Sequence, residues 1–262
     1  MVLTPLRAWR PWREHFSAGN YKPLQQIHNF AQIFQIMQIF RGETDVPPEL
    51  RPYCFLAPRL RRTRQPRDFS DVELALVEVS SATELNYRGY SLHQFGINQN
   101  LIRPHFWAIP AQRRLANLWV KGLRAFDEDT RAKNAQALIE ALPAETPNAE
   151  LLRSILDETR SAPADSAAGL TALRSKLSCP IGLVIRHFRY MPDGRPVSWP
   201  PDFVETLRTT AQRLNIPVFD PAPMVAAAGV EEAIGDETDH YRESYRPIMG
   251  EALTNFALSV AG

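Results

Sequence analysis

The stretch Asp71–Ser81, DVELALVEVSS, carries the clearest strand pattern in the chain. Five apolar residues, two of them β-branched, are packed into a short run with polar residues on both sides. Such a run is typical of a strand that is buried on both faces of a parallel sheet. It ends in two serines, where a parallel sheet would present its carboxyl edge. In open α/β sheets, ligands bind outside that edge. We therefore expect Ser80 and Ser81 to lie close to a site.

Two further strands follow at a distance that leaves room for helices. Residues 181–185 (IGLVI) form a second apolar run, and residues 216–220 (IPVFD) form a third. Residues 202–214 between them have helical spacing. The alternation of strand, helix and strand predicts a parallel α/β sheet with right-handed crossovers.

Residues 110–178 form a helical region that interrupts this alternation. Prolines separate four stretches of helical spacing, with Asn148 and Asp165 as N-cap candidates. We interpret residues 110–178 as a helical insertion in a single domain that covers residues 1–262. Upstream, residues 23–40 are expected to be helical and residues 53–56 to form a short strand. Residues 82–109 have no periodicity and are expected to be an irregular, functional segment.

Composition excludes several classes of protein. The chain has 262 residues, a net charge of +1 and 44% apolar residues, which indicates a globular protein without a global attraction to nucleic acid. No apolar run reaches the length of a transmembrane segment, and no signal peptide is visible, so we expect a cytoplasmic location. Cys54 and Cys179 lack metal-ligand spacing, and no metal or organic cofactor is expected. The Arg-rich residues 59–67 are either a solvated loop or a contact for an anionic partner.

Four groups of polar residues are candidates for chemistry. Ser80 and Ser81, His187, and Asp220 each follow a predicted strand. The fourth group is the acidic loop 236–239, which stands directly before His240. Neighbouring carboxylates raise the pKa of a histidine and fix its orientation, as a general base requires. An acidic loop of this kind is also common on protein surfaces.

This combination of strands and polar residues resembles the SGNH/GDSL hydrolases and their acyltransferase relatives. In that family, an acid stands three residues before the catalytic histidine, a spacing that matches Glu237 and His240. The pair Ser80-Ser81 resembles the Ser-Ser pair that closes this strand in a bacterial branch of the family, a branch often linked to polysaccharide modification. The resemblance implies a flavodoxin-like, doubly wound sheet and an ester hydrolase or O-acyltransferase that acts on an acylated saccharide. It implies His240 as the base, Glu237 or Asp239 as its acid, and Ser80, Ser81 and His187 as substrate contacts.

One part of the family pattern is missing. The family's nucleophile follows the first strand, yet only Val2 and Leu3 precede Thr4-Pro5, and no Gly-Asp-Ser or Gly-Ser-Cys block follows them. The first strand and nucleophile would then be absent from the sequence, and the Asp71–Ser81 strand would lack its natural neighbour. The alternative is a catalytically inactive binding or assembly protein in polysaccharide biosynthesis.

Overall fold

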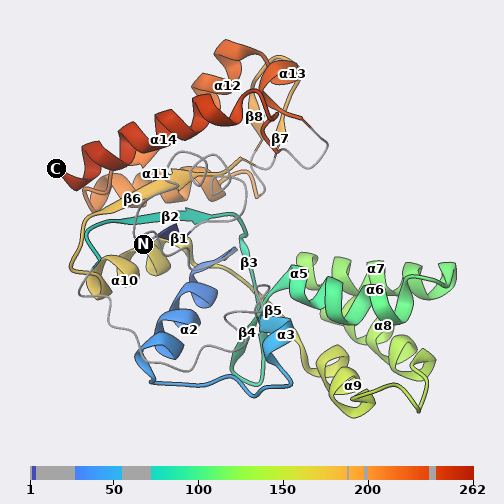
Figure 1. Cartoon of the computed structure of the whole chain (residues 1–262). Coiled ribbons are helices and arrows are strands. Elements are labelled where there is room, and N and C mark those ends of the chain that lie inside the picture. Colours follow the sequence, from blue (N-terminus) through green and yellow to red (C-terminus); the bar gives the residue numbers. More distant parts are fainter. Residues whose placement is uncertain (1, 4–26, 55–71, 188, 198–199, 236–239) are drawn as a thin grey trace. The chain divides into compact units, whose positions relative to one another are not determined.

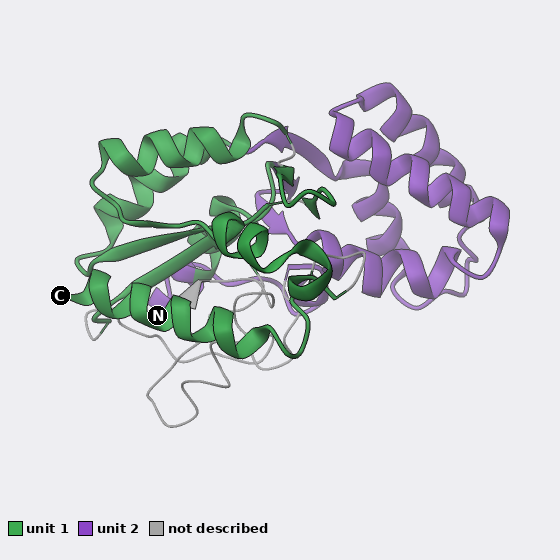
Figure 2. Cartoon of the chain, turned by 90° about the horizontal axis from the view of Figure 1, so that it is seen from above, with its two compact units in different colours: residues 1–36, 67–82, 165–262 green, residues 37–66, 83–164 purple. Residues whose placement is uncertain are grey.

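The chain folds into two compact units, each assembled from separate stretches of sequence. The computed structural model describes residues 2–3, 27–54, 72–187, 189–197, 200–235 and 240–262. Unit 1 comprises residues 1–36, 67–82 and 165–262, and unit 2 comprises residues 37–66 and 83–164 (Figure 2). The predicted helical region 110–178 is therefore divided, because its last helix belongs to unit 1. The single domain remains a prediction.

Unit 1 is built on a parallel sheet. Its strands are β1 (Val2–Leu3), β2 (Ala75–Val79), β6 (Ile181–Ile185) and β9 (Val218–Phe219), in the order β1-β2-β6-β9. All three pairings are parallel, and β2 aligns with β6 from Ala75↔Ile181 to Val79↔Ile185. Every residue of β2 and β6 is buried, which explains their continuous apolar runs. The predicted α/β class with a parallel sheet is confirmed.

The neighbour that we expected β2 to lack is present. Val2 pairs with Leu76 and Leu3 pairs with Val77. The two-residue strand β1 is therefore the neighbour of β2 on the side opposite β6. β1 was not predicted, because two apolar residues are too few to show a period.

Helices lie on both faces of this sheet, with α14 above it and α10 below it in Figure 1. A buried cluster that includes Leu76, Val184, Met249 and Leu253 joins the strands to α14. The helices of unit 1 are α10 (Ser166–Lys176), α11 (Phe203–Arg213), α12 (Ala222–Ala228), α13 (Val230–Ala233) and α14 (Arg246–Ala261). A small hairpin, β7 (Arg189–Tyr190) and β8 (Pro196–Val197), follows β6.

The helix α2 (Phe30–Arg41) supplies residues to both units. It begins where Asn29 Oδ1 accepts a hydrogen bond from Gln32 N at 3.0 Å, which caps the helix. Its start lies later than the predicted Pro23, and residues 23–26 are outside the described part. Gly169 of α10 packs directly on the ring of Phe30, where a Cβ would collide with it.

Unit 2 combines a three-stranded antiparallel sheet with a group of helices. The sheet contains β4 (Tyr90–Leu92), β3 (Thr83–Tyr87) and β5 (Arg160–Pro163), in that order. The helices are α3 (Arg51–Cys54), α5 (Gln94–Ile97), the π-helix η1 (Asn98–Ile102), α6 (Arg103–Phe106), α7 (Pro110–Ala125), α8 (Glu128–Ala141) and α9 (Ala149–Glu158).

Two predictions for unit 2 were wrong. Tyr53 and Cys54 of the expected strand 53–56 belong to a helical turn, Arg51–Cys54, because Tyr53 N and Cys54 N donate to Leu50 O. Residues 55–56 lie outside the described residues. Residues 82–109 are not irregular. They contain the β3–β4 hairpin, whose turn residues Arg88 and Gly89 have φ of 50° and 85°, and then α5, η1 and α6. The π-helix has a longer repeat than an α-helix, so the 3.6-residue period does not persist through this stretch.

Candidate functional site

Three strands of the unit 1 sheet end at the same edge, because β2, β6 and β9 run parallel. Ser80 is the first residue after β2, His187 is the second residue after β6, and Asp220 is the first residue after β9. The structure therefore brings the predicted strand-end residues to one edge of the sheet.

His187 and Asp220 form the best-defined pair at this edge. His187 Nε2 lies 2.9 Å from Asp220 Oδ1, and Arg208 Nη2 of α11 donates to Asp220 Oδ2. The backbone N–H of Ala222, at the start of α12, donates to Asp220 Oδ1 at 2.9 Å. His187 is only 2% exposed, so its imidazole is held in one orientation. Arg208 was not predicted as a site residue, because no sequence spacing relates a residue of α11 to the end of β9.

The pKa of Asp220 results from opposing effects. Burial raises it, whereas the hydrogen bonds from His187 and Ala222 and the positive charge of Arg208 lower it, and the net direction is downward. Asp220 is therefore a carboxylate at neutral pH. It can fix the tautomer of His187 and stabilise the charged imidazolium, as an orienting carboxylate does beside a catalytic histidine.

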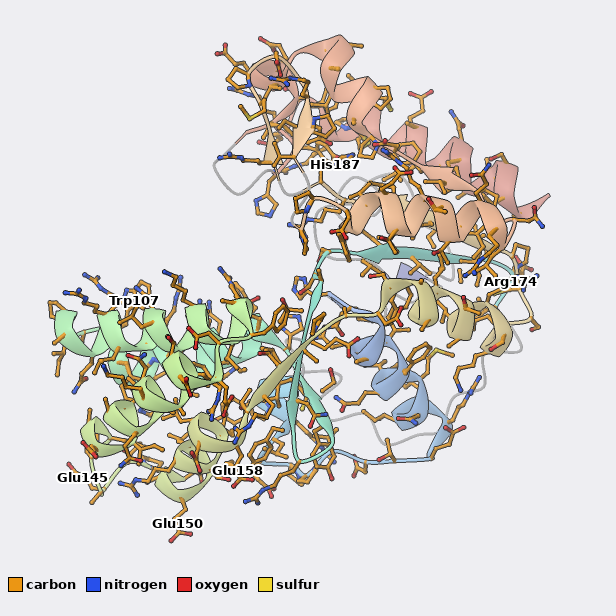
Figure 3. All side chains as sticks on the ribbon, turned by 180° about the vertical axis from the view of Figure 1, so that it is seen from behind. Trp107, Glu145, Glu150, Glu158, Arg174 and His187 are labelled. Atoms are coloured by element: carbon orange, nitrogen blue, oxygen red, sulfur yellow. The ribbon has the colours of Figure 1, made fainter. Side chains whose placement is uncertain are left out.

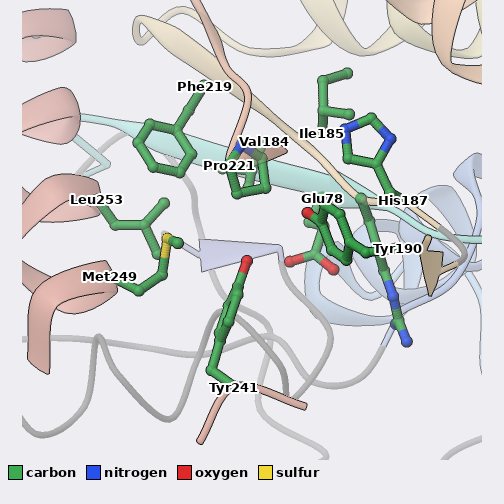
Figure 4. Close-up of a pocket in the computed structure, with 11 residues that line it drawn as sticks. Glu78, Val184, Ile185, His187, Tyr190, Phe219, Pro221, Tyr241, Met249 and Leu253 are labelled. Carbon is green, nitrogen blue, oxygen red and sulfur yellow. The ribbon is translucent and has the colours of Figure 1, made fainter. Parts of the chain in front are cut away.

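A small cavity lies beside His187. It has a volume of about 10 Å³, enough for about one water molecule. Figure 4 shows the carboxylate of Glu78 and the hydroxyl of Tyr241 pointing toward the same space. The ring of Tyr190 meets the His187 ring edge-on, with the centroids 5.7 Å apart. The cavity is lined by Glu78, Val184, Ile185, Arg186, His187, Tyr190, Phe219, Pro221, Tyr241, Met249 and Leu253.

Glu78 is a site residue that the sequence analysis missed. It is 2% exposed and lies inside β2, opposite Val184 of β6. A carboxylate in a buried strand costs free energy unless it is paired, and such groups gather at functional sites. The signal was present, because Glu78 is the one charged residue among the five buried positions of β2.

Ser80 and Ser81 are held by His28, which lies just before α2. The backbone N–H groups of both serines donate to the His28 carbonyl, at 3.0 and 2.8 Å. The Ser80 hydroxyl lies 2.7 Å from His28 Nδ1. The backbone amides of both serines and the Ser80 hydroxyl are thus engaged by His28, and the substrate contact predicted for these serines stays a prediction. The role of His28 was also missed, because 52 residues separate it from Ser80.

The predicted catalytic group is described only in part. His240 is half-buried, its carbonyl accepts from Gly235 N at 2.7 Å, and Tyr241 forms a β-bridge with Ile234. Tyr241 lines the cavity, whereas His240 is not among the lining residues. Glu237 and Asp239 lie outside the described residues.

Among the described residues, no group of three or more His, Cys, Asp or Glu side chains could hold a metal ion. Within the same residues, no helix is both long enough and apolar enough to span a membrane.

The family model for the TviD N-terminal domain matches residues 1–256. No curated protein and no solved structure matches the chain.

Proposed function

The chain belongs to the TviD N-terminal domain family, which indicates a role in polysaccharide biosynthesis, and on this basis we propose an SGNH-like enzyme. It would hydrolyse or transfer an O-acyl ester on a saccharide. The parallel sheet with helices on both faces supports the flavodoxin-like architecture of such enzymes. The polar residues at its carboxyl edge support a site at that edge.

The observation that carries the proposal is the His187–Asp220 pair. A buried imidazole fixed by a carboxylate, with an arginine on the second carboxylate oxygen, is suited to hold a proton at a defined atom. Acyl transfer needs such groups, because a proton must leave the attacking group and another must reach the leaving saccharide hydroxyl.

The proposed roles are those that the resemblance to the SGNH hydrolases implies. His240 is the general base, with Glu237 or Asp239 as its orienting acid. His187, Ser80 and Ser81 contact the acylated saccharide at the strand ends. The resemblance puts the nucleophile directly after the first strand, and β1 ends at Leu3.

The test is turnover of an acetylated saccharide and of a nitrophenyl acetate. The His240→Ala variant is expected to lose about a thousandfold or more in kcat, as loss of a catalytic histidine does. His105→Ala is the matched control, because His105 belongs to α6 of unit 2. Unchanged turnover in His240→Ala would rule out this role for His240.

A second function is a catalytically inactive binding or assembly protein. The cavity volume of about 10 Å³ favours it, because an acyl group needs more space than one water molecule. Saccharide binding in a titration, together with no turnover of either ester, would support this alternative.

A further inference from the structure

Unit 2 contains a long stretch of sequence without acidic residues. No Asp or Glu stands between Glu84 and Asp127, whereas six Lys or Arg residues do. The net charge of +1 for the whole chain conceals this local excess. A local excess of one sign creates a field that attracts a partner of opposite charge.

Four of these cations lie on α7 and are exposed: Arg113, Arg114, Lys121 and Arg124. Their spacing, together with exposed Asn117, follows the three- and four-residue repeat of a helix face. The stripe extends for roughly 16 Å along the helix, at about 1.5 Å per residue. The opposite face of α7 buries Ala116, Trp119 and Leu123. The cations therefore form one continuous outer surface.

Within the described residues, these four cations and Arg103 of α6 form no ion pair with a carboxylate. Unit 2 does contain paired arginines elsewhere. Arg88 bonds Glu158 through two nitrogens, at 2.6 and 2.5 Å, and Arg131 bonds Glu128 in the same manner. These cations thus differ from Arg88 and Arg131 in that no carboxylate is bonded to them, and the charge of Lys121 acts on a carboxylate only by lowering the pKa of Asp127.

Large apolar side chains project from the same region. Trp107 and Ile109, between α6 and α7, are 41% and 50% exposed. The guanidinium carbons of Arg103 and Arg113 lie 5.9 and 5.5 Å from the centre of the Trp107 ring. Trp107 is labelled on this group of helices in Figure 3. Exposed tryptophan and isoleucine beside arginines are typical of surfaces that enter the lipid headgroup region.

We propose that this surface docks the protein on a membrane that contains anionic lipids. The α6–α7 surface is defined by Arg103, Trp107, Ile109, Arg113, Arg114, Lys121 and Arg124. The cations approach the lipid phosphates, and Trp107 and Ile109 enter the boundary between headgroups and acyl chains. A soluble polyanion would use the cations but would gain little from Ile109. The inference goes beyond the proposed enzymatic function and does not depend on it.

The test is co-sedimentation of the full chain with vesicles at low ionic strength. The wild type is expected to bind vesicles of phosphatidylcholine with about one third phosphatidylglycerol, and to remain in solution with phosphatidylcholine alone. The double variant Arg114→Gln/Lys121→Gln should bind about 30-fold more weakly, about fivefold for each charge. Glutamine has nearly the helix propensity of arginine and lysine, so α7 should persist.

Two further double variants complete the test. Lys133→Gln/Arg213→Gln removes the same charge from exposed positions outside the α6–α7 surface and should bind like the wild type. Trp107→Ala/Ile109→Ala should bind roughly tenfold more weakly or worse. The proposal is overturned if the wild type fails to sediment with the anionic vesicles, or if the control variant weakens binding as much as Arg114→Gln/Lys121→Gln. It is also overturned if Trp107→Ala/Ile109→Ala binds like the wild type, because the surface would then recognise charge alone, as a soluble polyanion site does.

Discussion

Asp220 is the residue on which the candidate site depends. It accepts hydrogen bonds from an imidazole, a guanidinium and a backbone amide, and these come from the segment after β6, from α11 and from α12. Each partner favours the charged carboxylate. Removing the negative charge of the Asp220 carboxylate therefore affects both the orientation of His187 and the packing of the elements that meet at this edge of the sheet.

The variant Asp220→Asn is expected to lower the free energy of unfolding at pH 7 by about 1–3 kcal/mol, because a charged acceptor with three donors is replaced by a neutral one. The pKa of Asp220 is depressed in the folded state, so its stabilising effect is present above the unfolded pKa of about 3.9 and disappears as pH falls through the folded pKa. Urea unfolding of both proteins between pH 7 and pH 3 measures this difference.

Asp202→Asn is the control for that experiment, because Asp202 is exposed at the start of α11 and its side chain does not cap the helix. The difference between wild type and Asp220→Asn should shrink below about pH 4. A difference that stays constant over the whole range would contradict the assigned role of the carboxylate.

The sequence predicts which residues stand at strand ends, but not which residues they contact. Ser80, His187 and Asp220 could be placed at one edge because apolar runs mark strands and parallel strands share an edge. His28 lies 52 residues from Ser80 and Arg208 lies 12 residues from Asp220, and no local pattern relates either of them to a strand end. Long-range contacts depend on how elements pack, which a single sequence does not display.

At the level of elements, strongly periodic segments were predicted closely and short ones were not. The run 181–185 coincides with β6, and two of the four helical stretches expected within residues 110–178 correspond to α7 and α8. The hairpin β3–β4 was missed because its strands carry polar residues such as Asn86 and Glu84. The Arg88–Gly89 turn requires positive φ at both residues, and arginine gives no signal for that conformation.

The contact between α7 and α8 supplies a prediction for an element. A Cβ on Gly122 would lie 2.7 Å from Arg131 N and 3.0 Å from Arg131 Cα, which are backbone atoms of α8. Gly122→Ala should therefore destabilise the protein by about 1–3 kcal/mol. This is opposite in sign to the gain of up to about 1 kcal/mol that alanine normally brings to a helix.

Asn117→Ala, at an exposed position of the same helix, is the matched control and should change stability by no more than about 0.5 kcal/mol. Chemical denaturation, followed by far-ultraviolet circular dichroism, measures both variants. If Gly122→Ala were as stable as Asn117→Ala, the close approach of α7 to α8 would be wrong.

For the whole molecule, the two units are linked by the path of the chain. Three of the four points where the chain passes between units lie within the described residues, at 36/37, 82/83 and 164/165. The first lies inside α2, and the last directly precedes Asp165, the N-cap of α10. Unfolding one unit alone would have to break α2 between two hydrogen-bonded turns. Continuity of this kind favours cooperative unfolding.

We therefore expect the chain to unfold in one calorimetric transition, with equal calorimetric and van't Hoff enthalpies. Gly122→Ala in unit 2 and Leu183→Ala in β6 of unit 1 should both lower the midpoint of that transition. Leu183 is fully buried, so its truncation should cost about 2–5 kcal/mol. For a chain of this size, each kcal/mol lowers the midpoint by about 2–4 °C. Two transitions, each shifted by only one of the substitutions, would show that the units are separate domains and would contradict the single domain predicted from the sequence.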